Sequence, residues 1–159
     1  MPQSDTPKRP PGATISLGQL PELLGYHIRV AQIATFRDFD RHLKGHRISP
    51  TLYGALTVVE ANPGLKQSEL AHAVQLDRST VVSVVDTLQR RGLVARRQLD
   101  GDRRANAVVL TAKGEQLLKE IRPLVAEHET QLAAGLSTRD RARLIELLER
   151  VFPERNQSE

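Results

Sequence analysis

The chain has 159 residues and contains no cysteine and no tryptophan, and aromatic residues make up 3% of it. Without cysteine there is no disulfide, no thiolate zinc site and no cysteine nucleophile, and nothing indicates an oxidising compartment. We therefore expect a cytoplasmic protein. The scarcity of aromatic rings also argues against recognition of RNA or single-stranded DNA, because that recognition relies on base stacking.

Long apolar runs are absent as well. No uninterrupted apolar segment approaches the roughly 20 residues that span a bilayer, so no membrane helix is expected. Residues 1–14 are polar and rich in proline and lack the apolar stretch of a secretory signal, which predicts a disordered tail. The formal net charge of +4 suits a polyanionic partner, and with so few aromatic residues duplex DNA is the favoured one.

Apolar periodicity and capping residues predict a mainly α protein with one small β-hairpin. Two short helices joined by a tight turn, over 67–74 and 77–91, are typical of a helix-turn-helix. Strands over 93–99 and 105–110 flank an Asp-Gly turn with a basic tip. The other expected helices cover 17–44, run from Ser49-Pro50 to the Asn62-Pro63-Gly64 stop, and begin at Thr111 and Ser137.

The helix over 77–91 has two different faces. Apolar residues recur at offsets of zero, three, four and seven and form its buried side: Val81, Val84, Val85 and Leu88. The outward side carries the candidate DNA contacts Ser79, Thr80, Val82 and Ser83. Hydroxyl groups can bond base edges or phosphates, and a valine can meet a thymine methyl. Alternatively, these side chains only cover a solvated amphipathic helix.

Arginines cluster in the hairpin that follows. Arg103 and Arg104 lie at the tight turn, where long cationic side chains can reach phosphates or a narrow minor groove, and Arg96 and Arg97 extend the basic patch. Ordinary surface charge is the alternative, but the position directly after a groove-sized helix favours DNA contact. Asp102 is either a turn residue alone or pairs with an arginine and fixes the hairpin against the helix.

Three segments in this order resemble the MarR family: 65–71, 76–93 and 100–114. The resemblance covers roughly Leu17 to Phe152 and implies a winged helix-turn-helix lobe plus a helical dimerisation domain. It places Ser79, Thr80 and Ser83 in the recognition helix and matches Asp102 and Arg104 to the Asp-x-Arg wing pattern. Lys66 stands where many relatives have a threonine cap, and Ser83 where an arginine is common.

The resemblance also implies a domain plan and partners. We expect a tail over 1–14, an N-terminal dimerisation helix over 15–47, a DNA-binding domain over 48–110 and C-terminal dimerisation helices over 111–153. The expected partners are a palindromic operator in double-stranded DNA, a second copy of the chain, and a small aromatic acid or its acyl-CoA thioester that releases a repressor. The expected role is control of aromatic compound catabolism.

Tyr26, His27 and Arg29 cluster in the first helix and are the candidate effector contacts. They could hold an anionic aromatic ligand, whereas a buried tyrosine and histidine more often serve the core with satisfied hydrogen bonds. The same segment resembles that of relatives that sense acyl-CoA thioesters.

No catalytic motif appears, and no cofactor or metal is expected. The five histidines are scattered among different segments, and the spacing of His42 and His46 is interrupted by Gly45 without a completing carboxylate. A winged-helix protein-interaction module without specific DNA binding is the alternative to a regulator.

Overall fold

The computed structural model defines residue 12 and residues 14–99 and 102–151, with the backbone alone for residues 99 and 102–106. Most of the expected N-terminal tail therefore lies outside the described residues. The chain divides into two units, residues 1–34 and residues 35–159. None of the helices in the described ranges is long and apolar enough to cross a membrane.

The first helix begins later than the sequence predicts. A short 3-10 helix, η1 (Leu20–Glu22), comes first, and α1 (Leu24–His42) follows it, so the expected start at Leu17 is wrong. Leu23 between them has an extended backbone, with φ −94° and ψ 122°, and a helix cannot continue through that conformation. In the turn after α1, Arg47 has a left-handed backbone with φ 52°.

The predicted caps are confirmed, because at each one a side-chain oxygen accepts a backbone N–H of the first turn. Ser49 accepts from Leu52 before α2 (Pro50–Ala61), at 3.3 Å. Thr111 accepts from Gly114, at 3.1 Å, before α5 (Ala112–Leu132), and Ser137 accepts from Asp140, at 3.1 Å, before α6 (Thr138–Val151). These bonds satisfy helix-start donors that have no partner within the helix.

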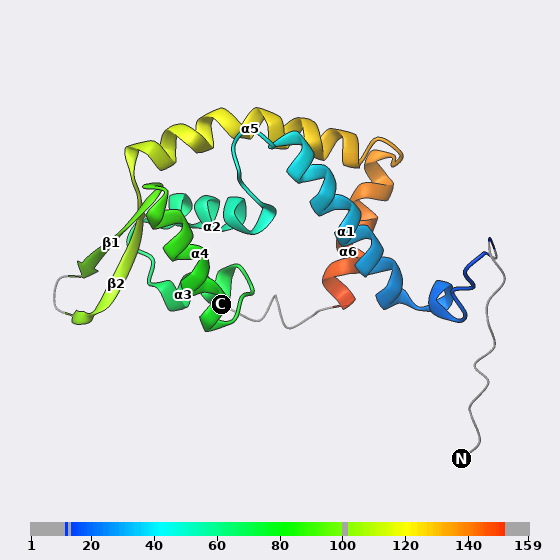
Figure 1. Cartoon of the computed structure of the whole chain (residues 1–159), viewed down its shortest axis with the longest axis horizontal. Coiled ribbons are helices and arrows are strands. Elements are labelled where there is room, and N and C mark those ends of the chain that lie inside the picture. The colour runs from blue at the N-terminus through cyan, green and yellow to red at the C-terminus, as the bar shows by residue number, and fades with distance from the viewer. Residues whose placement is uncertain (1–11, 13, 100–101, 152–159) are drawn as a thin grey trace, which may run out of the picture. The chain divides into compact units, whose positions relative to one another are not determined.

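Helices α3 (Gln67–Ala73) and α4 (Arg78–Arg90) form the predicted helix-turn-helix. Gln75 in the turn has φ 55°, a left-handed conformation that lets the chain reverse direction without a glycine. The backbone N–H of Leu76 donates to the carbonyl of Ala71 at 2.9 Å and holds the turn closed. The two helices lie beside the hairpin (Figure 1).

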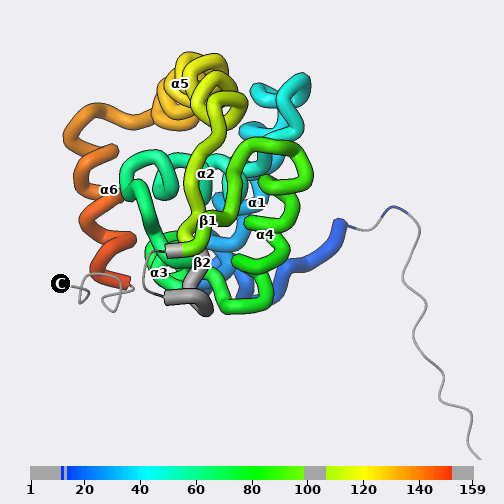
Figure 2. Tube along the Cα trace, turned by 90° about the vertical axis from the view of Figure 1, so that its left-hand side faces the viewer, coloured from blue at the N-terminus to red at the C-terminus, as the bar shows by residue number. Residues whose placement is uncertain are grey.

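The hairpin consists of β1 (Val94–Leu99) and β2 (Asp102–Leu110), paired antiparallel from Val94 with Leu110 onwards. The second strand begins three residues before the expected Ala105, and the register shifts between Gln98 and Leu99. Residues 102–104 do not alternate between hydrophobic and polar, so the hydrophobic pattern of the sequence did not mark them as part of a strand. The hairpin and α4 lie side by side in both views (Figure 1, Figure 2).

One hydrophobic core joins these elements within the second unit. The predicted inner face of α4 is confirmed, because Val81, Val84, Val85 and Leu88 are all buried. They meet buried residues of the other helices and of the hairpin: Phe39, Leu43, Leu56, Val59, Leu70, Leu93, Val94, Val108, Leu118 and Ile121. With its inner face fixed in this core, α4 has a defined outer face.

Candidate nucleic-acid interface

The outer face of α4 carries the predicted contact residues. Ser79, Val82 and Ser83 are exposed, and Val82, an apolar residue, has 41% of its surface open to solvent. Thr80 is half-buried at the border of the two faces. Three of the four predicted side chains are therefore presented together on the accessible side of one helix.

Asp77 organises the start of α4. Its carboxylate accepts hydrogen bonds from Ser79 Oγ at 2.5 Å, from Thr80 Oγ1 at 2.6 Å and from the Thr80 backbone N–H at 2.8 Å. Each hydroxyl group donates its single hydrogen to this carboxylate, so each presents only oxygen lone pairs to a ligand. At this end of α4, Ser79 and Thr80 are suited to accept from base amino groups, such as those of adenine or cytosine.

The same bonds stabilise the charged form of Asp77. The hydroxyl of Ser79, followed by the hydroxyl and backbone N–H of Thr80, holds the pKa of Asp77 well below its ordinary value of 3.8. Because the folded-state pKa lies below the unfolded-state value, this interaction adds stability at pH values above about 4. That stability is lost as the pH falls further, toward the depressed pKa.

Substitution of the cap tests this assignment. We expect Asp77→Ala to lower the melting temperature at pH 7 by a few degrees, because α4 loses its side-chain cap. Asp77→Asn keeps a capping oxygen that does not titrate, so between pH 4 and pH 2 it should lose less stability than the wild type. Thermal melts monitored by circular dichroism across this range measure both effects. If the melting temperatures of the wild type and of Asp77→Asn fall by the same amount between pH 4 and pH 2, the assignment is contradicted.

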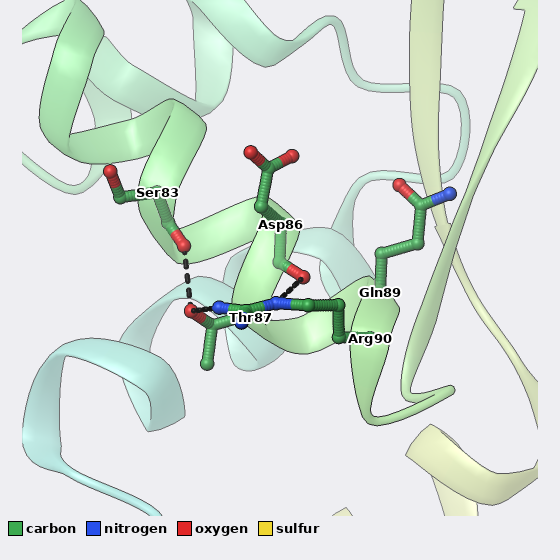
Figure 3. A pocket seen from close by; sticks show the side chains of 5 residues that line it. All are labelled: Ser83, Asp86, Thr87, Gln89 and Arg90. Carbon is green, nitrogen blue, oxygen red and sulfur yellow. Dashed lines mark hydrogen bonds between the residues drawn. The ribbon is translucent and has the colours of Figure 1, made fainter.

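A shallow depression of about 620 Å³ lies on α4 beyond Ser83, and five side chains line it: Ser83, Asp86, Thr87, Gln89 and Arg90 (Figure 3). Thr87 Oγ1 donates to the Ser83 carbonyl at 2.8 Å, and Arg90 Nη2 donates to Thr87 Oγ1 at 3.2 Å. Arg90 therefore lies back along the helix. The depression has a mixed polar lining with both charge signs.

The two neighbouring arginines of β1, Arg96 and Arg97, differ in exposure and in hydrogen bonding. The side chain of Arg97 is exposed, and its guanidinium forms no hydrogen bond or ion pair with any described residue, which leaves it available for a phosphate. Arg96 is half-buried and bonds to Asp86, with Nη2 to Oδ1 at 2.6 Å, and to two glutamines. The side chains of Asp102, Arg103 and Arg104 lie outside the described residues, so their predicted roles stay predictions.

The predicted effector residues lie in the first unit. The rings of Tyr26 and His27 meet edge to face with centroids 5.6 Å apart, and His27 Nε2 lies 2.8 Å from the carbonyl oxygen of Pro21. Arg29 is exposed. This local cluster offers an aromatic edge and a cation, and its role in binding a ligand stays a prediction.

The histidines form no metal centre among the described residues, where no group of three or more histidine, cysteine or acidic side chains is arranged around an ion. His42 uses both ring nitrogens, at 3.0 Å from the Asp38 carbonyl oxygen and 3.0 Å from Gln131 Oε1. His46 contributes its backbone carbonyl to Arg91 and no ring contact to His42.

Sequence reasoning missed the contacts that hold α4 in place from outside the core. At its C-terminal end, Arg91 donates to the carbonyl oxygens of His46 and Arg47, at 2.8 Å and 2.5 Å. In its second half, Asp86 and Gln89 bond Arg96. These partners are 7 to 45 residues apart, and no local pattern signals such pairs.

A helix-turn-helix with an outward polar helix face and an adjoining basic hairpin defines a winged helix-turn-helix DNA-binding protein. Residues 48–105 match the MarR family. The chain is 40% identical over 136 residues to a transcriptional regulatory protein for the hcr operon of Thauera aromatica, covering 85% of this chain and 82% of that protein. It is 32% identical over 122 residues to the transcriptional repressor MprA of Escherichia coli K12, covering 76% and 69%.

Solved structures agree with these relatives. The transcriptional repressor CouR bound to a 23-mer DNA duplex superimposes with a TM-score of 0.81 and 34% identity, covering 87% of this chain and 99% of CouR. CouR bound to p-coumaroyl-CoA gives a TM-score of 0.81 and 32% identity, covering 87% and 97%. The chain belongs to the MarR family. It is a DNA-binding transcriptional regulator and not an enzyme.

Proposed function

We propose that the protein is a homodimeric repressor that occludes a palindromic operator and is released by an aromatic acid or its acyl-CoA thioester. The observation that carries the DNA-binding part is the outer face of α4, which is polar, exposed and fixed by a buried inner face. With 13 residues at 1.5 Å each, α4 is about 20 Å long, which suits insertion along a major groove about 12 Å wide.

In this proposal each side chain of α4 has its own task. Ser79 and Thr80 accept hydrogen bonds from base amino groups, and Val82 contacts a thymine methyl. The Ser83 hydroxyl donates to the Ser79 carbonyl oxygen at 3.2 Å, so Ser83 likewise accepts from a base edge. Arg97, Arg103 and Arg104 bind phosphates or the minor groove beside the recognition helix. The small side chains near the start of α4 allow close approach of the helix to the bases.

Dimerisation is supported by apolar side chains that a single chain leaves uncovered. In α6, five of them are exposed: Leu144, Ile145, Leu147, Leu148 and Val151. In the first unit the exposed set is Ile15, Leu17, Leu20, Leu23, Leu24, Val30 and Ile33. Exposed large apolar side chains gathered on one helix in this way are typical of an interface. We propose that a second copy covers them, with 15–47 and 111–153 as the dimerisation segments and 48–110 as the DNA-binding domain.

A two-fold dimer sets the geometry of the operator. Two α4 helices read half-sites on one face of the duplex when their centres are about 34–36 Å apart, one DNA turn. An effector releases the repressor only if it binds better to a dimer with another spacing, since equal affinity for both states shifts nothing.

The proposed effector class rests on the likeness to CouR and on the local cluster of Tyr26, His27 and Arg29. Titrating the protein–DNA complex with p-coumaroyl-CoA, free p-coumarate and coenzyme A separately tests the class. Release by the thioester or the acid, and not by coenzyme A alone, supports the proposal, and retention of the complex with all three overturns it for this ligand.

The wing gives a quantitative test of DNA contact. We expect Arg103→Ala with Arg104→Ala to reduce the slope of log binding constant against log salt by about 2, because about one counterion is released for each neutralised phosphate. Affinity for all DNA sequences should fall together. Fluorescence anisotropy of a labelled duplex at several salt concentrations measures the slope, and Lys119→Ala with Arg122→Ala in α5 is the control. An unchanged slope would show that these arginines do not contact phosphates.

A further inference from the structure

Arg96 connects three elements of the DNA-binding lobe. From β1 its Nη2 donates to Asp86 Oδ1 in α4 at 2.6 Å, and Nε and Nη2 donate to Gln67 Oε1 at the start of α3, at 3.3 Å and 3.2 Å. Its Nη1 donates to Gln89 Oε1 in α4. The side chain is 24% exposed, in contrast to the exposed, unbonded Arg97 next to it.

These bonds leave Arg96 little capacity for DNA. A guanidinium has five N–H donors, and four hydrogen bonds to protein are formed here. Its charge is also paired with the Asp86 carboxylate. A phosphate contact would require that this pairing be given up.

The ion pair between Arg96 and Asp86 has a second consequence, which concerns the charge on the surface of α4. Its side chain is 49% exposed on α4 and lines the surface depression beyond Ser83 (Figure 3). An unpaired carboxylate at that place would repel the phosphates of a duplex approaching α4. Arg96 cancels this charge and at the same time ties β1 to the helix.

We propose that Arg96 is a positioning residue that fixes the hairpin to α3 and α4, so that recognition helix and wing meet DNA as one rigid unit. This inference rests on the proposed DNA contacts of α4 and the wing and adds a role that the sequence did not assign, since Arg96 was expected to contact DNA directly. Lysine cannot replace it, because a single ammonium group does not match the planar fork that reaches acceptors on two helices.

The test compares Arg96→Ala, Arg96→Lys and Asp86→Ala with the matched neighbour Arg97→Ala. We expect the first three to weaken operator binding by about tenfold without changing the salt slope, and the double variant Asp86→Ala with Arg96→Ala to lose no more than the larger single loss. Arg97→Ala should reduce the slope by about 1. A slope reduced by about 1 in Arg96→Ala, with no loss in Asp86→Ala, would overturn the proposal.

A second readout needs no DNA. Hydrogen exchange of the β1 and β2 amides in the free protein should be faster in Arg96→Ala and in Arg96→Lys than in the wild type, and unchanged in Arg97→Ala. Identical exchange in all four proteins would overturn the positioning role. Because this measurement involves no operator, it separates failure of this inference from failure of the proposed function.

Discussion

Replacement of Gly114 by alanine is expected to lower the free energy of unfolding by about 3 kcal/mol, because the added methyl group has no room in the folded chain. A Cβ at this position would lie 2.1 Å from the carbonyl oxygen of Leu93 and 3.2 Å from Leu110 Cδ2. The Leu93 carbonyl cannot move freely, because it accepts the backbone N–H of Thr111 at 3.1 Å. The clash therefore separates the first turn of α5 from the base of the hairpin.

Urea unfolding followed by circular dichroism measures this change, and Gly54→Ala in α2 is the matched control. Gly54 is also a helical glycine, but a Cβ there meets nothing within 4 Å. It should leave stability unchanged or raise it by roughly 0.5–1 kcal/mol, through lower backbone entropy of the unfolded chain. Equal midpoints for Gly114→Ala and the wild type would show that the contact with Leu93 is not as close as described.

The second large effect concerns assembly. Leu144→Glu combined with Leu148→Glu places two charges on one face of α6, since residues four apart lie one above the other on a helix. Both leucines are exposed in the single chain, so the fold itself should persist. We expect the protein to become monomeric and its operator affinity to fall at least about 100-fold, because the two half-sites then no longer bind as one linked unit.

Arg150→Glu is the control for that experiment. It changes the net charge by the same two units on the same helix, but at 200° around α6 from Leu148 it lies on the opposite side. Sedimentation equilibrium and operator titration report mass and affinity together. A Leu144→Glu, Leu148→Glu protein that stays dimeric would remove α6 from the proposed interface.

Local features of the fold were predictable because the cause lies within a few residues. Ser49, Thr111 and Ser137 were expected as caps and accept the predicted backbone hydrogens. The inner face of α4 followed from spacing alone. The start of α1 was not predictable in this way, because the extended conformation of Leu23 has no marker in apolar periodicity.

Contacts between residues far apart in the chain could not be predicted from the sequence. Nothing in the pattern distinguishes Arg96, which is paired with Asp86, from the exposed Arg97 beside it. His128 in α5 is a second example. It is buried against Phe39 and His42, and its ring nitrogens have no hydrogen-bond partner among the described residues. Such contacts arise from packing of α1 on α5 and are visible only in three dimensions.

We propose that the two α4 helices of a dimer read a specific operator. The most direct measurement is a titration of the purified protein against the intergenic DNA beside its own gene, at two salt concentrations and with excess nonspecific competitor. We expect saturable, salt-sensitive retention of a complex of dimer size that the competitor does not displace. Binding that nonspecific DNA competes away equally well, on this fragment and across a pool of genomic fragments, would contradict specific operator recognition and favour a protein-interaction module.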